Sequence, residues 1–121
     1  MRYIDVCGMP LPLKELQRGV NMLEKNIVNG IMKYLKTVPD CYVWKTHGGM
    51  YGTAGLPDLV CCISGCFIAF EVKTPTGKLT KIQEATIQKI NNAKGKAYKV
   101  TSVEDVKTIL ESLEGYPYEN K

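Results

Sequence analysis

Two apolar segments separated by only two residues constrain the fold of this chain more than any other feature of its sequence. Residues Asp58 to Ile63 and Cys66 to Lys73 are rich in valine, isoleucine, phenylalanine and cysteine, and Ser64-Gly65 stands between them. This arrangement predicts a β-hairpin with a tight two-residue turn. Successive strand residues point to opposite faces, and both faces of this hairpin are apolar. We therefore expect it to lie at the centre of a sheet that is covered above and below.

Helical and strand-like patterns surround the hairpin. Apolar residues recur every three or four positions from about Leu13 to Leu35, although Gly19 and Asn21 leave open a separate short helix before the main one. The expected elements are, in order, a helix (13–35), three strands (41–45, 58–63 and 66–73), a helix opened by a capping box (80–94), a strand (96–100) and a helix capped by a serine (102–113). This order predicts an α/β protein, with an α+β mixed sheet in a three-layer core.

Length and charge bound the class of protein. The 121 residues suit one domain, and we assign residues 21–121 to it and residues 1–20 to an N-terminal arm or short helix. A net charge of +4 permits a nucleic-acid partner without requiring one. No apolar stretch is long enough to span a membrane and none resembles a secretory signal, so we expect a cytoplasmic protein.

The five cysteines, at positions 7, 41, 61, 62 and 66, raise the question of a metal or disulfide framework. An odd number without a signal peptide predicts free thiols. A metal-binding protein built on these cysteines is disfavoured, because the chain has no second CxxC pair and its single histidine is His47. We expect the cysteines to act as small apolar core residues.

Three ionisable residues converge at the open end of the predicted hairpin. If Ser64-Gly65 forms the turn, Asp58 lies opposite Glu71 with β-carbons roughly 5 Å apart. Lys73 shares a strand face with Glu71 because the two are separated by one residue. Facing carboxylates repel and are costly to bury unless a cation compensates them. Oxygen ligands of this kind, including the backbone carbonyl of Val72, suit Mg²⁺ or Mn²⁺.

This set of residues predicts phosphodiester hydrolysis. A bound metal can acidify a water molecule and neutralise charge on a phosphate oxygen. Lys73 beside it could orient that water or stabilise the charge that develops at phosphorus. The alternative is a structural ion pair between Lys73 and Glu71 or Asp58, and the opposition of two acids argues against it.

Two helix residues extend this candidate site. Glu24 falls on the apolar stripe of the first helix, so it lies either at the margin of the stripe or aimed at the metal, where it could hold a metal-bound water. Gln83 closes the capping box with Thr80, yet it also falls on the inner face of its helix and could bond to a water or a phosphate. The two roles of Gln83 are compatible.

The extended motif has a familiar form. Gly55-Leu-Pro-Asp58, twelve intervening residues, and Glu71-Val-Lys73-Thr-Pro-Thr-Gly77-Lys-Leu-Thr followed by Gln83 resemble the PD-(D/E)xK nuclease superfamily, specifically its VRR-NUC branch, the virus-type replication-repair nucleases. The resemblance runs from about Glu24 to Leu110. It implies a restriction-endonuclease-like core similar to that of Holliday-junction resolvases. Small members of the branch occur in phages and bacteria, serve DNA repair and recombination, and tend to be homodimers.

The resemblance also implies roles for the site residues. Asp58, Glu71 and the Val72 carbonyl would bind magnesium or manganese, and Lys73 would be catalytic. Glu24 and Gln83 match the helix-borne site residues of the branch.

The leading hypothesis is a structure-selective endonuclease that cuts branched DNA, including four-way junctions, as a symmetric homodimer. A nicking, flap or single-strand nuclease could use the same site, and a non-catalytic DNA-binding module is the alternative from another class. The candidate DNA contacts are phosphate donors that flank the site, namely Lys45, Thr46, His47, Gly48, Gly49, Thr74, Lys78 and Lys81.

Overall fold

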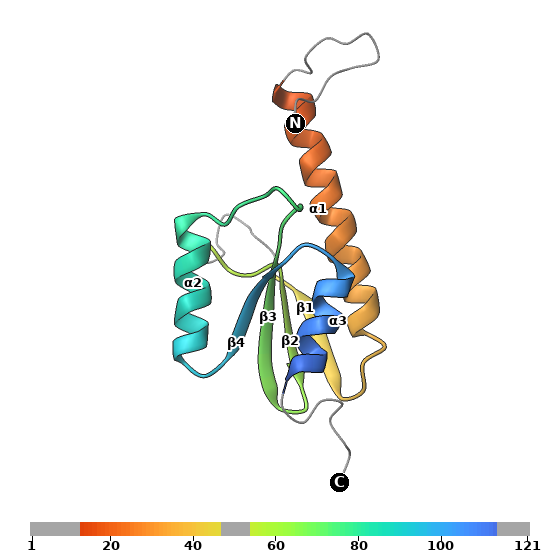
Figure 1. The fold of residues 1–121 in the computed structure, drawn as a ribbon, viewed down its shortest axis with the longest axis vertical. Coiled ribbons are helices and arrows are strands. Elements are labelled where there is room, and N and C mark those ends of the chain that lie inside the picture. The colour runs from red at the N-terminus through yellow and green to blue at the C-terminus, as the bar shows by residue number, and fades with distance from the viewer. Residues whose placement is uncertain (1–12, 47–53, 114–121) are drawn as a thin grey trace.

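The computed structural model describes residues 13–46 and 54–113 (Figure 1). Their elements are α1 (Leu13–Leu35), β1 (Cys41–Lys45), β2 (Leu59–Ile63), β3 (Cys66–Val72), α2 (Lys81–Asn92), β4 (Lys96–Val100) and α3 (Val103–Ser112). The predicted elements and their order are confirmed. The possible break near Gly19 and Asn21 is absent, because α1 continues through both residues as one helix. Of residues 1–20, assigned above to an arm or short helix, residues 13–20 belong to α1 and residues 1–12 lie outside the described residues.

The sheet has the order β1-β2-β3-β4. β1, β2 and β3 are successive antiparallel strands, and β4 pairs parallel with β3 after the crossover through α2. Ile63 pairs with Cys66, and Ser64 and Gly65 both have positive φ values, of 49° and 87°. Two positive φ values define the turn type that matches the twist of a hairpin. The predicted register of the hairpin is therefore confirmed.

Helices cover the two sheet faces unequally (Figure 1). α1 and α3 lie on one face and bury a large core that includes Ile31, Phe70 and Leu110. α2 lies on the other face, where the buried cluster is limited to Val60, Ala69 and Ala97, with Ile87 and Ile90 of α2 packed against it. The three-layer prediction is confirmed.

The expectation that both faces of the hairpin are covered holds only in part. Cys62 and Phe67 lie on the α2 face and are exposed, as is the neighbouring Tyr42. This face is four strands wide, whereas α2 has 12 residues and packs mainly along β4, so it shields only some of the apolar side chains. The α2 face of β1 and β2 therefore remains open to solvent.

The cysteines of the described residues are free thiols, as predicted; Cys7 lies outside these residues. Cys61 and Cys62 point to opposite faces, one buried and one exposed. Burial raises the pKa of the Cys61 thiol, which keeps it protonated and unreactive. Across residues 13–46 and 54–113, no three Cys, His, Asp or Glu side chains gather as a metal ligand set. In the same residues, no helix has the length and apolar character needed to cross a membrane.

Candidate functional site

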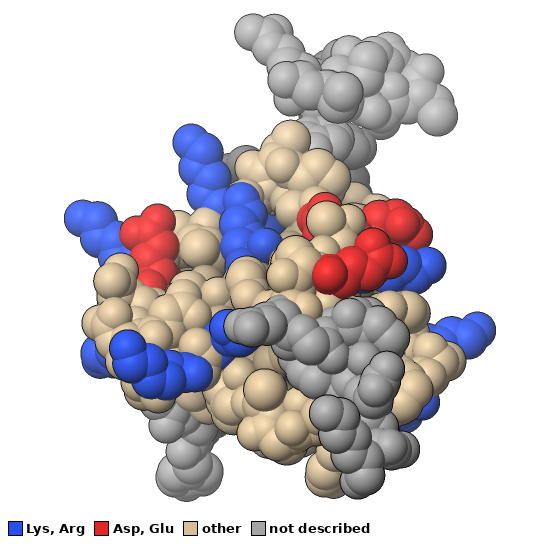
Figure 2. Space-filling view, turned by 60° about the horizontal axis from the view of Figure 1, so that its bottom comes forward, with Lys and Arg blue, Asp and Glu red and all other residues tan. Residues whose placement is uncertain are grey.

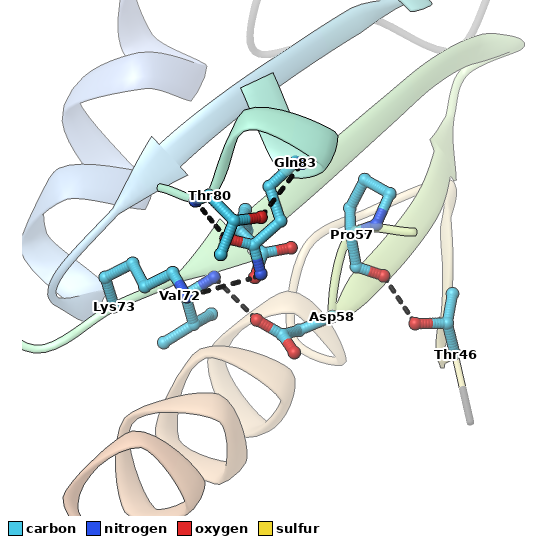
Figure 3. A network of polar contacts seen from close by, with 8 residues as sticks. Thr46, Pro57, Asp58, Val72, Lys73, Thr80 and Gln83 are labelled. Carbon is cyan, nitrogen blue, oxygen red and sulfur yellow. Dashed lines mark hydrogen bonds and ion pairs between the residues drawn. The ribbon is translucent and has the colours of Figure 1, made fainter. Parts of the chain in front are cut away.

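Asp58, Lys73 and Gln83 lie close together at one end of the sheet (Figure 3), where Glu71 contacts both Lys73 and Gln83. Asp58 directly precedes β2, Glu71 lies near the end of β3, and Lys73 directly follows β3. Gln83 belongs to the first turn of α2, which lies over the same sheet face. The hairpin and α2 thus bring together side chains that are up to 25 positions apart in the sequence.

The hairpin ladder ends at the pair Leu59–Phe70, because Pro57 cannot continue it. The strand predicted to begin at Asp58 begins instead at Leu59, which pairs with Phe70. Continuing this register by two residues places Pro57 opposite Val72, and proline has no N–H to donate to the Val72 carbonyl. The Val72 N–H donates to Oδ2 of Asp58 over 2.8 Å instead. Asp58 therefore meets β3 through its carboxylate.

This ladder end also fixes the direction of the Val72 carbonyl. The N–H and C=O of one residue in an antiparallel pair are directed to the same neighbouring strand. Because the Val72 N–H is directed to Asp58, the Val72 carbonyl faces the same side. A carboxylate and a backbone carbonyl oxygen are thereby directed to one place at the end of β2 and β3.

Glu71 is a buried carboxylate with incomplete compensation. The residue is 3% exposed, and its Oε1 accepts a hydrogen bond from Nε2 of Gln83 over 2.8 Å. Lys73 Nζ lies 3.9 Å from the same oxygen. Its Oε2 is buried and accepts no hydrogen bond from any described residue. Burial, and next the Asp58 carboxylate, raise the Glu71 pKa to about 8, although Lys73 lowers it.

Gln83 closes the predicted capping box and also reaches the candidate site, where it bonds to Glu71; a bond to a water or a phosphate stays a prediction. Its backbone N–H donates to Thr80 Oγ1 over 3.2 Å, and its side-chain Oε1 accepts from the Thr80 N–H over 2.9 Å. Because the capping box occupies Oε1, the amide Nε2 is directed to Glu71 (Figure 3). The start of α2 thus holds one oxygen of the buried carboxylate in place.

Glu24 lies within electrostatic range of this centre. It is half-buried on α1, and its charge contributes to the raised pKa of Glu71 as the last of several causes. It does not form a three-carboxylate cluster with Asp58 and Glu71 in the described part of the chain. A role for Glu24 in holding a metal-bound water stays a prediction.

The donors present fit a hard divalent cation. Asp58 and Glu71 supply carboxylate oxygens, and the Val72 carbonyl supplies a neutral one. The buried Oε2 of Glu71 accepts no hydrogen bond from a described residue, and burying such an atom is unfavourable. A cation beside it would compensate this cost. Among the described residues no histidine or cysteine completes the set, which favours magnesium or manganese over zinc.

The predicted DNA contacts have different surroundings. Lys45 donates to Oδ1 of Asn29 on α1 over 2.6 Å, and the Thr46 hydroxyl donates to the Pro57 carbonyl. Thr74 is buried and therefore not a surface contact. Two lysines, Lys78 and Lys81, are exposed. The remaining candidates, His47, Gly48 and Gly49, lie outside the described residues.

Sequence reasoning missed how the segment before Asp58 is held. Thr46 bonds to Asp58 and Pro57, since its N–H donates to the Asp58 carbonyl over 3.0 Å. Gly55 has a φ of +80°, and a β-carbon there would lie 2.3 Å from Cγ2 of Ile82. The close approach of this segment to α2 therefore requires glycine. Gly55 is the first residue of the Gly55-Leu-Pro-Asp58 motif, so the sequence does contain a signal for this close approach.

We expect Gly55→Ala to destabilise the protein by at least about 1–2 kcal/mol, the cost of a side chain in the left-handed region. Gly65→Ala is the matched control, because Gly65 has a φ of +87° but its β-carbon would meet no described atom within 4 Å. Urea unfolding should show a loss of stability in both variants. The loss should be larger in Gly55→Ala, where the added β-carbon also meets Ile82, and an equal loss in both variants would contradict the assigned role.

Solved structures provide the comparison with known proteins. One, described as "VRR_NUC domain", superposes with a TM-score of 0.64 at 20% sequence identity and covers 74% of this chain and 96% of its own. Another, "VRR_NUC domain protein", has a TM-score of 0.61 at 18% identity and covers 73% and 84%. No protein-family model and no curated protein matches the sequence. The chain therefore has the VRR-NUC fold, and the predicted fold is confirmed.

Proposed function

We propose that this chain is a magnesium- or manganese-dependent endonuclease that hydrolyses phosphodiester bonds in DNA. The observation that carries the proposal is the buried Glu71 carboxylate, whose Oε2 has no hydrogen-bond partner among the described residues, beside Asp58 and Lys73. A structural ion pair between Lys73 and Glu71 would not need the Asp58 carboxylate. That carboxylate raises the Glu71 pKa and so disfavours the charged form of Glu71. The VRR-NUC fold supports the same conclusion.

Each residue has a role in the proposed mechanism. Asp58, Glu71 and the Val72 carbonyl would hold the cation, and Glu24 would contact it through water. A metal held by these residues would supply an acidified water and would neutralise charge on the phosphate. Lys73 Nζ, 3.9 Å from Glu71, orients the attacking water or stabilises the charge that develops on the phosphate oxygens. Gln83 holds Glu71 Oε1 through a hydrogen bond, which would leave Oε2 available as a metal ligand.

The proposed substrate is branched DNA, including Holliday junctions, cut by a homodimer. A two-fold dimer presents two sites to two strands of a two-fold junction, which suits paired incisions. A nicking, flap or single-strand nuclease would use the same residues. A non-catalytic DNA-binding module would not need the acids and the lysine together.

Cleavage assays test the proposal. We expect the full chain to cut labelled four-way or flap DNA in Mg²⁺ or Mn²⁺ and to be inactive in EDTA. Asp58→Asn should be inactive, and Glu84→Gln, which neutralises an exposed carboxylate on α2, should retain activity. Binding of branched DNA without cleavage in any metal would favour the non-catalytic module.

Sedimentation of the protein with and without four-way DNA tests the dimer. A complex of two chains per junction is expected. A monomer that cuts the two strands in independent steps would contradict paired cutting and leave the nuclease proposal intact.

A further inference from the structure

Exposed aromatic side chains lie on the same sheet face as the carboxylates. Tyr42 is 71% exposed, Phe67 45% and Trp44 40%, and the rings of Tyr42 and Trp44 are 5.5 Å apart. Contiguous apolar groups on a surface usually mark a binding site. We define these three residues as the aromatic surface.

The register aligns the aromatic surface with the candidate site in successive cross-strand rows. Tyr42, Cys62 and Phe67 form one row, and Trp44, Val60 and Ala69 form the next. Asp58 and Glu71 follow two residues beyond Val60 and Ala69, on the same face. Two strand residues advance about 7 Å, so the far row lies roughly 14 Å from the carboxylates. Nucleotides stacked in one strand rise about 3.4 Å each, so a few of them span this distance.

Positive charge borders the α2 side of this face. Residues 81–100 carry five exposed lysines, at positions 81, 89, 94, 96 and 99, against one acid, Glu84. In Figure 2 basic side chains gather on the left, the side on which α2 lies in Figure 1. Phe67 packs against the position of Gly95, between Lys94 and Lys96, so aromatic and basic groups meet at one end of the aromatic surface.

We propose that the aromatic surface binds the unpaired strand of a DNA substrate by stacking on its bases and leads that strand to Asp58 and Glu71. Flat aromatic rings accept any base, and flanking lysines track the phosphates, which is how sequence-independent single-strand sites are built. The inference rests on the proposed function, because it takes Asp58 and Glu71 as the site of cleavage. It adds that the substrate is DNA with an unpaired strand. A second copy of this chain is the competing occupant. The charge border and the continuity with the carboxylates favour DNA.

The single tryptophan makes the test direct. Trp44 emission of the full chain is followed in EDTA while a short oligothymidylate or a blunt duplex of equal length is added. We expect a saturable change with the single strand, at a concentration at least tenfold lower than with the duplex. Because EDTA removes the metal, this readout does not depend on cleavage.

Substitutions then distinguish the contribution of ring stacking to DNA binding from that of an apolar side chain alone. Tyr42→Leu and Phe67→Leu each keep an apolar side chain, and each should weaken binding of the single strand roughly tenfold. Tyr42→Phe keeps the ring and should bind as the unaltered chain does. With metal, Tyr42→Leu should slow the cleavage of flap DNA more than that of a fully paired four-way junction.

Three results would overturn the inference. The first is equal affinity for the single strand and the duplex, and the second is unchanged binding of the single strand by both leucine variants. The third is a Trp44 emission that changes with protein concentration in parallel with dimer formation measured by sedimentation. The last result would assign the aromatic surface to a second copy of the chain. Loss of single-strand binding in a protein that still cleaves would refute this inference alone, and binding without cleavage would refute the proposed function alone.

Discussion

Glu71→Gln is expected to stabilise the metal-free protein while abolishing cleavage. The carboxylate is buried beside Asp58, and its pKa is raised to about 8 from an ordinary value of 4.5. A raised pKa means that folding opposes ionisation, so the metal-free protein loses stability as the pH rises from about 4.5 to about 8. Each pKa unit corresponds to about 1.4 kcal/mol, so the variant should gain up to about 4 kcal/mol near pH 8.

Urea unfolding in EDTA across this pH range measures the effect. The two proteins should be almost equally stable below pH 4.5, where Glu71 is protonated, and should diverge above it. Added Mg²⁺ should stabilise the unaltered chain and leave the variant unchanged, since the variant lacks a charged ligand. Glu84→Gln, which neutralises an exposed acid, should match the unaltered chain both in the pH dependence of its stability and in its stabilisation by Mg²⁺. A variant that is less stable than the unaltered chain at pH 8 would contradict the assigned electrostatics.

Lys73→Ala is expected to reduce cleavage about 10²- to 10³-fold, the usual loss when one stabilising donor is removed from a reacting group. Its ammonium group lies 3.9 Å from Glu71 and is largely buried, with 14% of the side chain exposed. Because Lys73 directly follows β3, its side chain lies at the same end of the sheet as the Asp58 and Glu71 carboxylates. DNA binding and Mg²⁺ binding should be largely kept, because the carboxylates remain.

Single-turnover cleavage with saturating enzyme isolates this effect from DNA affinity. Lys36→Ala, which removes an exposed lysine at the opposite end of α1, is the control and should retain activity. Cleavage by Lys73→Ala at a rate close to that of the unaltered chain would exclude a catalytic role for this ammonium group. Lys73→Arg should restore little activity, since the bulkier planar group does not replace a compact ammonium.

The hairpin shows how much a sequence can determine locally. The apolar segments, the Ser64-Gly65 turn and the alternation of strand residues were enough to predict the register from Leu59–Phe70 to Ile63–Cys66. Turn geometry and side-chain period act between neighbours in the chain, so they can be read without the fold. The capping boundaries of α2 and α3 at Thr80 and Ser102 have the same local origin.

Three features depended on the tertiary structure. The sequence could place Gln83 on the inner face of a helix, but only the packing of α2 on β3 directs its amide to Glu71. The sequence placed Lys45 beside the site, whereas the packing of α1 on β1 brings Asn29 within hydrogen-bond distance of its ammonium group. Coverage of the sheet is also a tertiary property, because it depends on the width that one helix can shield; Tyr42 and Phe67 are exposed for this reason.

The sequence by itself determined the fold class, the hairpin and the residues of the candidate site, Asp58, Glu71 and Lys73. It did so because turn type, strand period and chemical identity are encoded over a few residues. Only the tertiary structure decided that Glu71 is buried with one oxygen that accepts no hydrogen bond from a described residue, that Asp58 accepts the Val72 N–H, and that an aromatic surface adjoins them. Burial and desolvation arise from elements far apart in the chain, and no local pattern encodes them.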